Sequence, residues 1–206
     1  MKGALVLAGG RSARFGRNKA FVKLGERPLV AHVVGAAAEV AEEVFLSIGR
    51  EDFVAHYRKL VPEFVKIVKD RMPVKSPLVG IAAGLEQMKS QYSLVLACDT
   101  PFLNKQVLEM LFHKTRSDAA IPRWPNGDIE PLQAAYRVRT ALPAAKLALS
   151  HNCFQIRDMI ELLSKVSYIR ISDIRRVDAE LVTFLNVNTP ADLVRAKAVY
   201  RQRRDC

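Results

Sequence analysis

The chain has 206 residues, of which 50% are hydrophobic and 26% are charged, and its formal net charge is +11. This composition excludes a disordered tail, a collagen-like fibre and a disulfide scaffold, and the length predicts one domain over residues 1–206. The positive charge leaves nucleic acid, an anionic membrane surface and a phosphorylated small molecule as candidate partners. A charge that only keeps the protein in solution is the fourth interpretation.

Cysteine content and hydropathy predict the compartment in which the protein works. Cys98, Cys153 and Cys206 are odd in number and widely spaced, which favours reduced thiols inside a cell. The apolar run over residues 4–8 is too short for a signal-peptide core, and no stretch of about 18 apolar residues exists to span a bilayer. We therefore expect a cytoplasmic protein without a membrane partner.

Short apolar runs alternate with segments of helical spacing through the first half of the chain. The first run ends at Gly9-Gly10, and prolines that suit a first helical turn stand at positions 28 and 77. We expect strands over residues 4–8, 44–48, 65–68 and 93–97, and helices over residues 28–43, 51–60, 77–89 and 104–114. Strand, loop and helix repeated four times predict an α/β fold with an open, mostly parallel sheet and right-handed crossovers.

The second half of the chain is less regular. Two short strands, residues 119–122 and 132–136, flank a turn over residues 124–128 and are expected to pair antiparallel. Pro131 lacks an N–H for a strand ladder, so we expect it at the start of its strand or on an edge. The later expected elements are helices over residues 140–150 and 155–163, a strand over 166–171, an extended segment over 183–188 and a last helix that Thr189-Pro190 opens.

A glycine-rich segment, residues 7–19, follows the first predicted strand, where ligands of open α/β sheets bind. Its glycines let the backbone approach a ligand, and Arg14 and Lys19 supply positive charge that suits a triphosphate. The segment is not a Walker A motif, because the lysine stands too far from Gly10 and Ala20 replaces the required hydroxyl residue. It also fits neither a dinucleotide-binding fingerprint nor a nucleophile elbow.

A carboxylate follows the most apolar predicted strand, in the segment Cys98-Asp99-Thr100-Pro101. We expect Asp99 at the same edge of the sheet as the glycine-rich segment, where it would hold Mg²⁺ against substrate phosphates. A cap of the following helix is the alternative role for Asp99. Cys98 is expected to pack in the core rather than to react.

The glycine-rich segment and four later segments together resemble the molybdenum cofactor guanylyltransferases, a family of nucleotidyltransferases with the GT-A fold. The first, Leu7-Ala8-Gly9-Gly10-x-Ser12-x-Arg14-Phe15-Gly16-x-x-Lys19, is similar to the family's signature loop, which many nucleotidyltransferases share. The later segments are Ser76-Pro77-Leu78-Val79-Gly80-Ile81, Cys98-Asp99-Thr100-Pro101-Phe102, Glu130-Pro131-Leu132 and Phe184-Leu185-Asn186-Val187-Asn188-Thr189-Pro190-x-Asp192-Leu193. Their combination along nearly the whole chain is specific to this family.

This resemblance implies a three-layer α/β/α, Rossmann-like fold with a mostly parallel sheet, as in the GT-A nucleotidyltransferases. It also implies an enzyme that transfers GMP from GTP to the terminal phosphate of molybdopterin, with Mg²⁺ as cofactor and pyrophosphate as leaving group. Molybdoenzymes or their chaperones are the protein partners that it implies.

The resemblance further assigns roles to the matched residues. The implied nucleotide-binding residues are Leu7, Ala8, Gly9, Gly10, Lys19, Asp70, Pro77, Leu78, Gly80 and Asp99. The implied catalytic residues are Arg14, Lys19 and Asp99, with Asp99 also as metal ligand, and the implied substrate-binding residues are Glu130, Asn186 and Asn188. For the asparagine pair, turn and cap chemistry before the last helix is the alternative role.

Three positions depart from the family pattern. Asn18, Gly49 and Ser76 stand where the family usually has Asp, Asn and Gly, which weakens individual nucleoside contacts more than the class assignment. Gly9 bears on the choice of base, because relatives that use CTP tend to carry alanine there. Its missing side chain would leave room for a purine, so Gly9→Ala is expected to disfavour GTP.

Other functions fit parts of the sequence. A cytidylyltransferase for the same cofactor, or a guanylyltransferase for adenosylcobinamide phosphate, would share the glycine-rich segment. A non-catalytic carrier of nucleotide or cofactor would not need Lys19 and Asp99, and both are present. A nucleic-acid binder would interleave cations with aromatic residues, whereas residues 195–204 carry only Tyr200 among five cations, so we expect no nucleic-acid partner.

Overall fold

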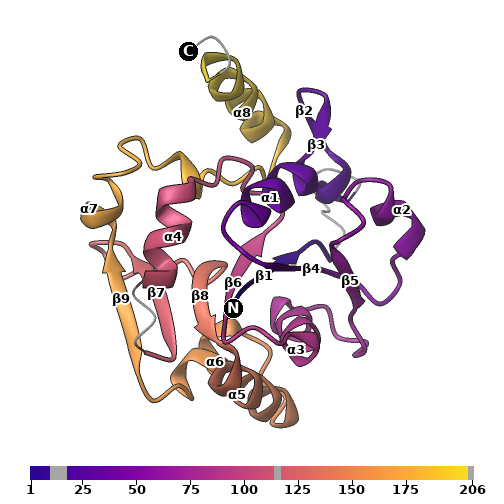
Figure 1. Ribbon diagram of the computed structural model, residues 1–206, viewed down its shortest axis with the longest axis vertical. Helices are drawn as coiled ribbons and strands as arrows, with labels where there is room; N and C mark the ends of the chain where they lie inside the picture. The colour runs from indigo at the N-terminus through magenta and orange to yellow at the C-terminus, as the bar shows by residue number, and fades with distance from the viewer. Residues whose placement is uncertain (10–17, 114–116, 204–206) are drawn as a thin grey trace.

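A mixed seven-stranded sheet with the order β5-β4-β1-β6-β8-β7-β9 forms the centre of the protein (Figure 1). The computed structural model describes residues 1–9, 18–113 and 117–203. The strands are β1 (Lys2–Leu7), β4 (Glu43–Ile48), β5 (Lys66–Lys69), β6 (Tyr92–Ala97), β7 (Ala119–Arg123), β8 (Gln133–Arg137) and β9 (Val166–Arg170). β1 pairs parallel with β4 and β6, β4 with β5, and β7 with β9, whereas β8 runs antiparallel to β6 and β7. The predicted mostly parallel sheet and the predicted antiparallel pair are both confirmed.

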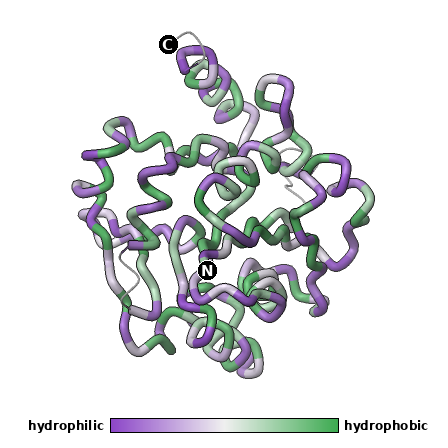
Figure 2. Tube along the Cα trace, viewed as in Figure 1, coloured by the Kyte–Doolittle hydropathy of each residue, from purple (hydrophilic) through white to green (hydrophobic). Residues whose placement is uncertain are grey.

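Helices cover both faces of this sheet (Figure 1). The described residues form the helices α1 (Leu29–Ala38), α2 (Val54–Arg58), α3 (Pro77–Gln87), α4 (Lys105–His113), α5 (Val138–Ser150), α6 (Ile156–Glu161), α7 (Ile171–Ile174) and α8 (Pro190–Gln202). Of these, α8 packs against residues 22–29 rather than against the sheet. Successive strand residues face opposite sides, so Leu5 packs with α3 and α5 while Val6 packs with α1 and α4. Figure 2 shows hydrophobic residues along the central strands, as expected for strands that are buried on both faces. This arrangement confirms the three-layer α/β/α, Rossmann-like fold.

Two of the predicted helices differ most from the observed ones, because both are predicted several residues too long. The helix predicted over residues 28–43 ends at Ala38, because residues 39–42 turn the chain back toward β1, where the Glu42 N–H donates to the Lys2 carbonyl oxygen at 2.9 Å. The helix predicted over residues 51–60 is confined to α2, since the preceding residues turn. Across the described residues, no helix combines the length and the apolar character that crossing a membrane requires.

The extended segment predicted over residues 183–188 is wrong at its start, where Val182–Phe184 form the 3₁₀ turn η2. Buried Asp178 stabilises this turn by accepting hydrogen bonds from the backbone N–H groups of Val182 at 3.3 Å and Thr183 at 2.9 Å. The sequence analysis also missed the 3₁₀ turn η1 (Lys19–Phe21), helix α7, and the hairpin of β2 (Lys23–Leu24) and β3 (Arg27–Pro28), which turns at Gly25 with a φ of 61°.

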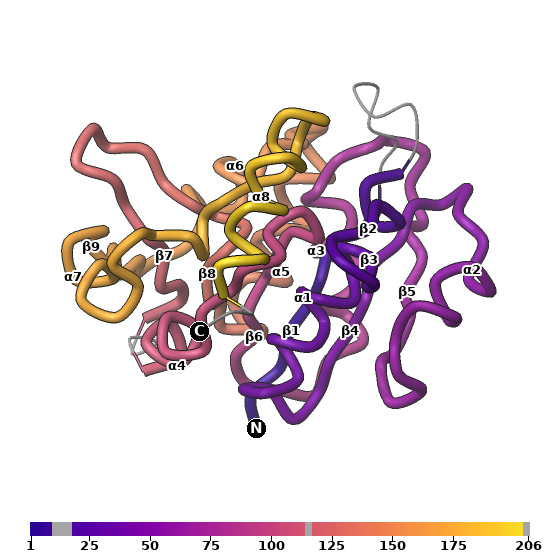
Figure 3. The backbone as a smooth tube through the Cα atoms, turned by 90° about the horizontal axis from the view of Figure 1, so that it is seen from above, coloured from indigo at the N-terminus to yellow at the C-terminus, as the bar shows by residue number. Residues whose placement is uncertain are grey.

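The parallel strands β1, β4, β5 and β6 end at one edge of the sheet, and backbone hydrogen bonds continue past the strand ends. The Ala8 N–H donates to the Ser47 carbonyl oxygen at 2.8 Å. The Cys98 N–H donates to the Leu7 carbonyl oxygen at 3.1 Å. At the two ends of the sheet, α2 lies beside β5 and α7 lies beside β9 (Figures 1 and 3). The carboxyl edge of the parallel strands is where a ligand site is expected in such a fold.

Candidate active site

A cavity of about 900 Å³ lies at the carboxyl edge of the parallel strands. Ligand cavities commonly measure roughly 300–1,000 Å³, so this one has room for a nucleotide. Of the residues predicted from the sequence, Leu7, Ala8, Gly9, Lys19, Asp70, Pro77, Gly80, Asp99 and Asn188 line it. Gly10 and Arg14 lie outside the described residues. The fold therefore brings together side chains that are far apart in the sequence.

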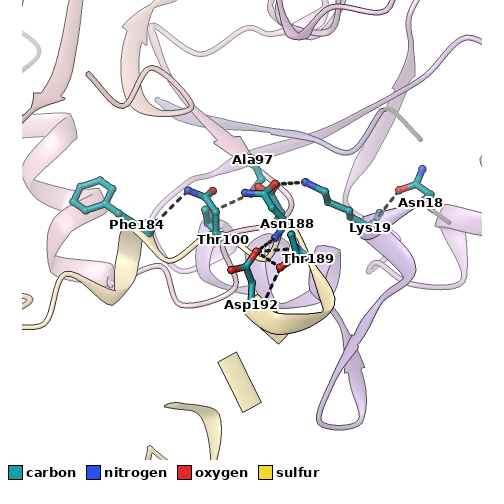
Figure 4. Close-up of polar contacts among 11 residues, drawn as sticks. Asn18, Lys19, Ala97, Thr100, Phe184, Asn188, Thr189 and Asp192 are labelled. Atoms are coloured by element: carbon teal, nitrogen blue, oxygen red, sulfur yellow. Dashed lines mark hydrogen bonds and ion pairs between the residues drawn. The ribbon is translucent and has the colours of Figure 1, made fainter. Parts of the chain in front are cut away.

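Three polar side chains meet on one wall of the cavity. The Lys19 Nζ atom lies 3.0 Å from Asp99 Oδ2. It also donates a hydrogen bond to Asn188 Oδ1 (Figure 4). The side chains of Lys19 and Asp99 are 21% and 16% exposed, so water and salt screen their attraction only in part. Two oxygens, one from a carboxylate and one from an amide, thus converge on a single cation.

The start of the last helix holds Asn188 in place. The Asn188 N–H donates to Asp192 Oδ2 at 3.0 Å, and Asp192 and Thr189 form the capping box of α8 (Figure 4). The hydrogen bonds from the Thr189 hydroxyl and the Asn188 N–H lower the pKa of Asp192. The predicted cap is therefore confirmed, and it leaves the Asn188 side chain free to reach Lys19. Asn186 instead donates to the Phe184 carbonyl oxygen at 3.3 Å and does not line the cavity.

Asp99 does not cap the helix that follows it. That cap is Asn104, whose side-chain oxygen accepts from the Gln106 N–H at 2.8 Å at the start of α4. The backbone carbonyl oxygen of Asp99 accepts from the Val187 N–H at 2.8 Å, which fastens the segment before α8 to the end of β6. The carboxylate of Asp99 is thus left to the cavity, and the helix-cap alternative is wrong.

A second carboxylate faces the cavity beside α3. Asp70 Oδ1 accepts a hydrogen bond from the Ser47 hydroxyl at 3.0 Å. Burial raises the pKa of Asp70, and the Ser47 hydrogen bond opposes part of that rise. A Cβ atom on Gly80 would lie 2.9 Å from Ser47 Oγ, so glycine lets α3 approach this pair closely. The arrangement offers an acceptor to ligand N–H or O–H groups.

Glycine at position 9 also has a packing reason, beside the room for a purine that the sequence suggested. A Cβ atom there would lie 2.9 Å from the backbone nitrogen of Gly49, at the end of the neighbouring strand β4. The chain segments that follow β1 and β4 therefore lie in close contact at these two glycines. Alanine at position 9 would therefore displace the backbone of the cavity wall, whatever base is bound.

Two other residues that the resemblance placed in the site do not line the cavity. Leu78 is fully buried in α3, where its N–H donates to the Ser76 hydroxyl at 3.1 Å. Glu130 accepts a hydrogen bond from the Trp124 indole N–H at 2.7 Å, and burial raises the pKa of its carboxyl group. Both residues support the surrounding structure in these positions.

The described lining of the cavity is not predominantly basic. It has three cationic and four acidic side chains, namely Lys19, Arg50, Lys75, Glu51, Asp52, Asp70 and Asp99. The described lining therefore does not account for the excess of positive charge in the whole chain, part of which lies on α8. Sequence reasoning missed Ser47 and Asp52; the one available signal was a serine inside an otherwise apolar strand.

The structure describes two of the three cysteines, and both agree with the expectation of reduced thiols. Cys98 is buried beside the cavity and Cys153 is exposed, and both are free. Burial raises the pKa of the Cys98 thiol, which disfavours the reactive thiolate. The predicted packing role of Cys98 is confirmed, and Cys206 lies outside the described residues.

Comparisons with known proteins agree with this geometry. The model of the MobA-like NTP transferase domain matches residues 4–166. A probable molybdenum cofactor guanylyltransferase from Methanosarcina mazei is 33% identical over 93% of this chain and 88% of the relative, and one from Natronomonas pharaonis is 34% identical over 94% of this chain and 95% of the relative.

Solved structures show the same fold. Molybdopterin-guanine dinucleotide biosynthesis protein A from Archaeoglobus fulgidus matches with a TM-score of 0.79 and 28% identity, over 98% of this chain and 100% of that one. The 2-C-methyl-D-erythritol 4-phosphate cytidylyltransferase from Thermus thermophilus matches with a TM-score of 0.70 at 19% identity, over 98% of this chain and 100% of that one, which shows a shared fold alone. The chain belongs to the family of MobA-like NTP transferases and is a nucleotidyltransferase.

Proposed function

We propose that the protein transfers GMP from GTP to the terminal phosphate of molybdopterin and releases pyrophosphate. The observation that carries this proposal is the contact of Lys19 with Asp99 and Asn188 inside a cavity of nucleotide size. The names of the relatives that match over most of the chain support the choice of guanine nucleotide and pterin.

The reaction needs positioning and charge neutralisation more than a protein nucleophile. The terminal phosphate of the acceptor is already ionised, so it attacks the α-phosphorus of GTP in line with the leaving pyrophosphate. Lys19 supplies positive charge where negative charge builds on the transferred and leaving phosphates. Arg14 is assigned the same role from its place in the glycine-rich segment.

Magnesium is the cofactor that we propose for this site. Carboxylate and amide oxygens are the ligands that Mg²⁺ prefers, and Asp99 and Asn188 already converge on one cation, the Lys19 ammonium. Among the described residues, no group of three or more His, Cys, Asp or Glu side chains gathers to hold a metal ion. Asp99 and Asn188 would therefore share the ion with substrate phosphates, where it would offset charge on the α-phosphate and on pyrophosphate.

The opposite end of the cavity suits the nucleoside. Asp70, held by Ser47 and covered by α3, offers carboxylate oxygens to a ribose hydroxyl or to the N–H groups of guanine. Glu130 and Asn186 lie outside the cavity lining, so we propose that they act on the pterin side. Molybdoenzymes or their chaperones as partners remain a prediction from the resemblance, and a cytoplasmic location remains a prediction from the cysteine content and hydropathy of the chain.

A panel of nucleotides tests the proposed function. The purified protein is mixed with molybdopterin, Mg²⁺ and either GTP, CTP, ATP or UTP, and pyrophosphate release is recorded. Release with GTP alone is the expected result. Faster release with CTP would favour the cytidylyltransferase, and release only when adenosylcobinamide phosphate replaces molybdopterin would favour the cobinamide enzyme. Tight GTP binding without any release would favour the carrier.

A further inference from the structure

A buried tyrosine lies directly behind the wall of the cavity. Tyr57, on α2, is 1% exposed, and the described lining of the cavity does not include it. Its hydroxyl oxygen lies 2.6 Å from Asn18 Nδ2, 3.0 Å from Asp52 Oδ2 and 3.3 Å from the Ala8 carbonyl oxygen. All three of these partners do line the cavity, so Tyr57 acts on a ligand only through them.

The directions of these hydrogen bonds follow from their partners. Asn18 Oδ1 accepts from the Ala20 N–H at 2.9 Å, which turns the amide nitrogen toward Tyr57 as a donor. The single hydroxyl hydrogen goes to the Asp52 carboxylate, because a charge-assisted hydrogen bond is the stronger of the two available. Asp52 Oδ2 also accepts from the Gly49 N–H at 2.9 Å. A chain of bonds therefore runs from the end of β4 to Asn18.

Tyr57 contacts the chain on both sides of Lys19, by a hydrogen bond on one side and by a ring contact on the other. Asn18 is the N-cap of η1, the turn that begins with Lys19. Phe21, the last residue of η1, packs against the ring of Tyr57 with the ring centroids 4.9 Å apart. The backbone of Lys19 is thus fastened to α2 by the residue before it and by the residue two positions after it.

We propose that Tyr57 is a positioning residue for the phosphate end of the cavity. Its hydroxyl links the end of β4 to Asn18 and so aims the Lys19 ammonium at the triphosphate. This inference rests on the proposed function, in which Lys19 contacts the phosphates of GTP. The competing explanation is that the hydroxyl only satisfies buried polar groups and adds stability. If Tyr57 positions Lys19, the effect of its hydroxyl on GTP affinity requires the Lys19 side chain. If the hydroxyl only adds stability, its effect is the same with or without that side chain.

A double-mutant cycle with Tyr57→Phe and Lys19→Met separates the two explanations. Tyr57→Phe keeps the ring contact with Phe21 and removes only the hydroxyl. In the otherwise wild-type protein we expect it to weaken GTP binding about tenfold, measured by isothermal titration calorimetry with Mg²⁺. In the Lys19→Met protein we expect a further loss of less than about twofold, because the group being aimed is gone. Equal losses in the two backgrounds, or no loss in the first, would overturn the proposal.

Two further measurements serve as controls for unspecific effects of the substitutions on folding. Tyr92→Phe removes a hydroxyl that accepts hydrogen bonds from Arg137 at the other end of β6, and we expect unchanged GTP affinity. With inorganic pyrophosphate and guanosine as separate competitors of GTP, Tyr57→Phe should weaken only the competition by pyrophosphate. Weaker competition by guanosine alone would place the effect at the wrong end of the cavity and contradict the proposal.

Asn18→Leu gives a second variant that leaves Tyr57 and Phe21 in place. It removes the amide that donates to the Tyr57 hydroxyl, whereas the hydrogen bond from Tyr57 to Asp52 can remain. We expect a loss of GTP affinity at least as large as in Tyr57→Phe, and wild-type affinity would contradict the proposal. The cycle measures GTP binding alone. A protein that binds GTP but transfers no GMP would therefore overturn the proposed function without deciding the role of Tyr57.

Discussion

The two halves of the sheet contribute to the cavity very differently. Strands β5, β4, β1 and β6 are parallel, and the segments that follow them supply nearly all of the described lining. The part of the chain after β6, including the mixed strands β8, β7 and β9, adds only Leu132 and Asn188 beyond the residues adjoining β6. The antiparallel strand β8 ends at the opposite edge, whereas β7 and β9 run in the same direction as β6 but lie beyond β8, away from the cavity. The parallel half therefore builds most of the proposed nucleotide site, and the second half completes it at Lys19.

Each half also holds its residues by a different means. The ends of β1 and β4 are joined by backbone hydrogen bonds and by the close approach of Gly9 to Gly49. Asn188 is held by the cap of α8, a local feature of a few residues. We therefore expect changes in the parallel half to affect nucleotide binding strongly, and changes at the start of α8 to have smaller effects.

Lys19→Met should have the largest effect, because Lys19 is the point at which the two halves meet. Loss of a fixed cation at the developing charge should lower kcat/KM for GTP by about 10²–10³-fold. Steady-state pyrophosphate release with molybdopterin and Mg²⁺ measures this. Lys89→Met, an exposed change beyond the end of α3, is the matched control and should leave kcat/KM unchanged. A Lys19→Met enzyme with nearly wild-type turnover would contradict the role of the contact.

Asp70→Asn should separate binding from stability within the parallel half. The variant loses a charged acceptor, so GTP affinity should fall roughly tenfold. The pKa of Asp70 is raised in the folded protein, so the folded state holds the proton more tightly than the unfolded state does. Stability of the wild type should therefore fall as pH rises from the unfolded pKa to the folded pKa, and the asparagine variant should lack this loss.

Thermal unfolding of the wild type and Asp70→Asn across the acidic to neutral range measures this second effect. The variant should have the higher Tm at neutral pH, and the difference should shrink as the pH is lowered. A variant that is less stable than the wild type at neutral pH would show that the ionised carboxylate stabilises the fold, against the burial seen here.

Asn188→Ala tests the contribution of the second half. Removal of one hydrogen-bond acceptor from Lys19 should lower kcat/KM for GTP by about fivefold, less than the Lys19 change itself. Asn188→Asp keeps an oxygen acceptor at the same place and should recover part of the loss. If Asn188→Ala lowers kcat/KM as much as Lys19→Met does, the second half of the sheet contributes more to the reaction than the described lining indicates.

Thr189→Ala should have the smallest effect on activity. Thr189 caps α8 and accepts from the Asp192 N–H at 3.2 Å, so its loss should lower the free energy of unfolding by about 1 kcal/mol. Urea unfolding measures the stability, and kcat/KM should change by less than about twofold because the Asn188 N–H still reaches Asp192. A loss of activity larger than that of Asn188→Ala would show that the cap acts on the site by another path.

The sequence predicted the parallel half better than the second half, for a physical reason. Apolar runs that end in glycine or aspartate identify β1 and β6 and also place Lys19 and Asp99 at one edge of the sheet. The turn η2 was missed because it depends on Asp178, whose carboxylate bonds to N–H groups several residues away.

Sequence patterns also could not predict the hydrogen bonds that Tyr57 forms behind the wall of the cavity. Tyr57 and Asn18 are 39 positions apart, and nothing in the spacing of either residue indicates that they meet. The two predicted asparagines differ in the same way. Their motif treats them alike, but the cap of α8 directs only Asn188 toward the cavity.

The most direct test of the account is to map GTP onto the protein by NMR. The amide signals of uniformly ¹⁵N-labelled protein are followed while GTP and Mg²⁺ are added. We expect the largest shifts at Gly9, Gly49, Asp70 and Asp99 in the parallel half, and at Asn188 in the second half. Shifts that gather on β7 and β9, with the ends of β1 and β4 unaffected, would contradict a nucleotide site built by the parallel strands.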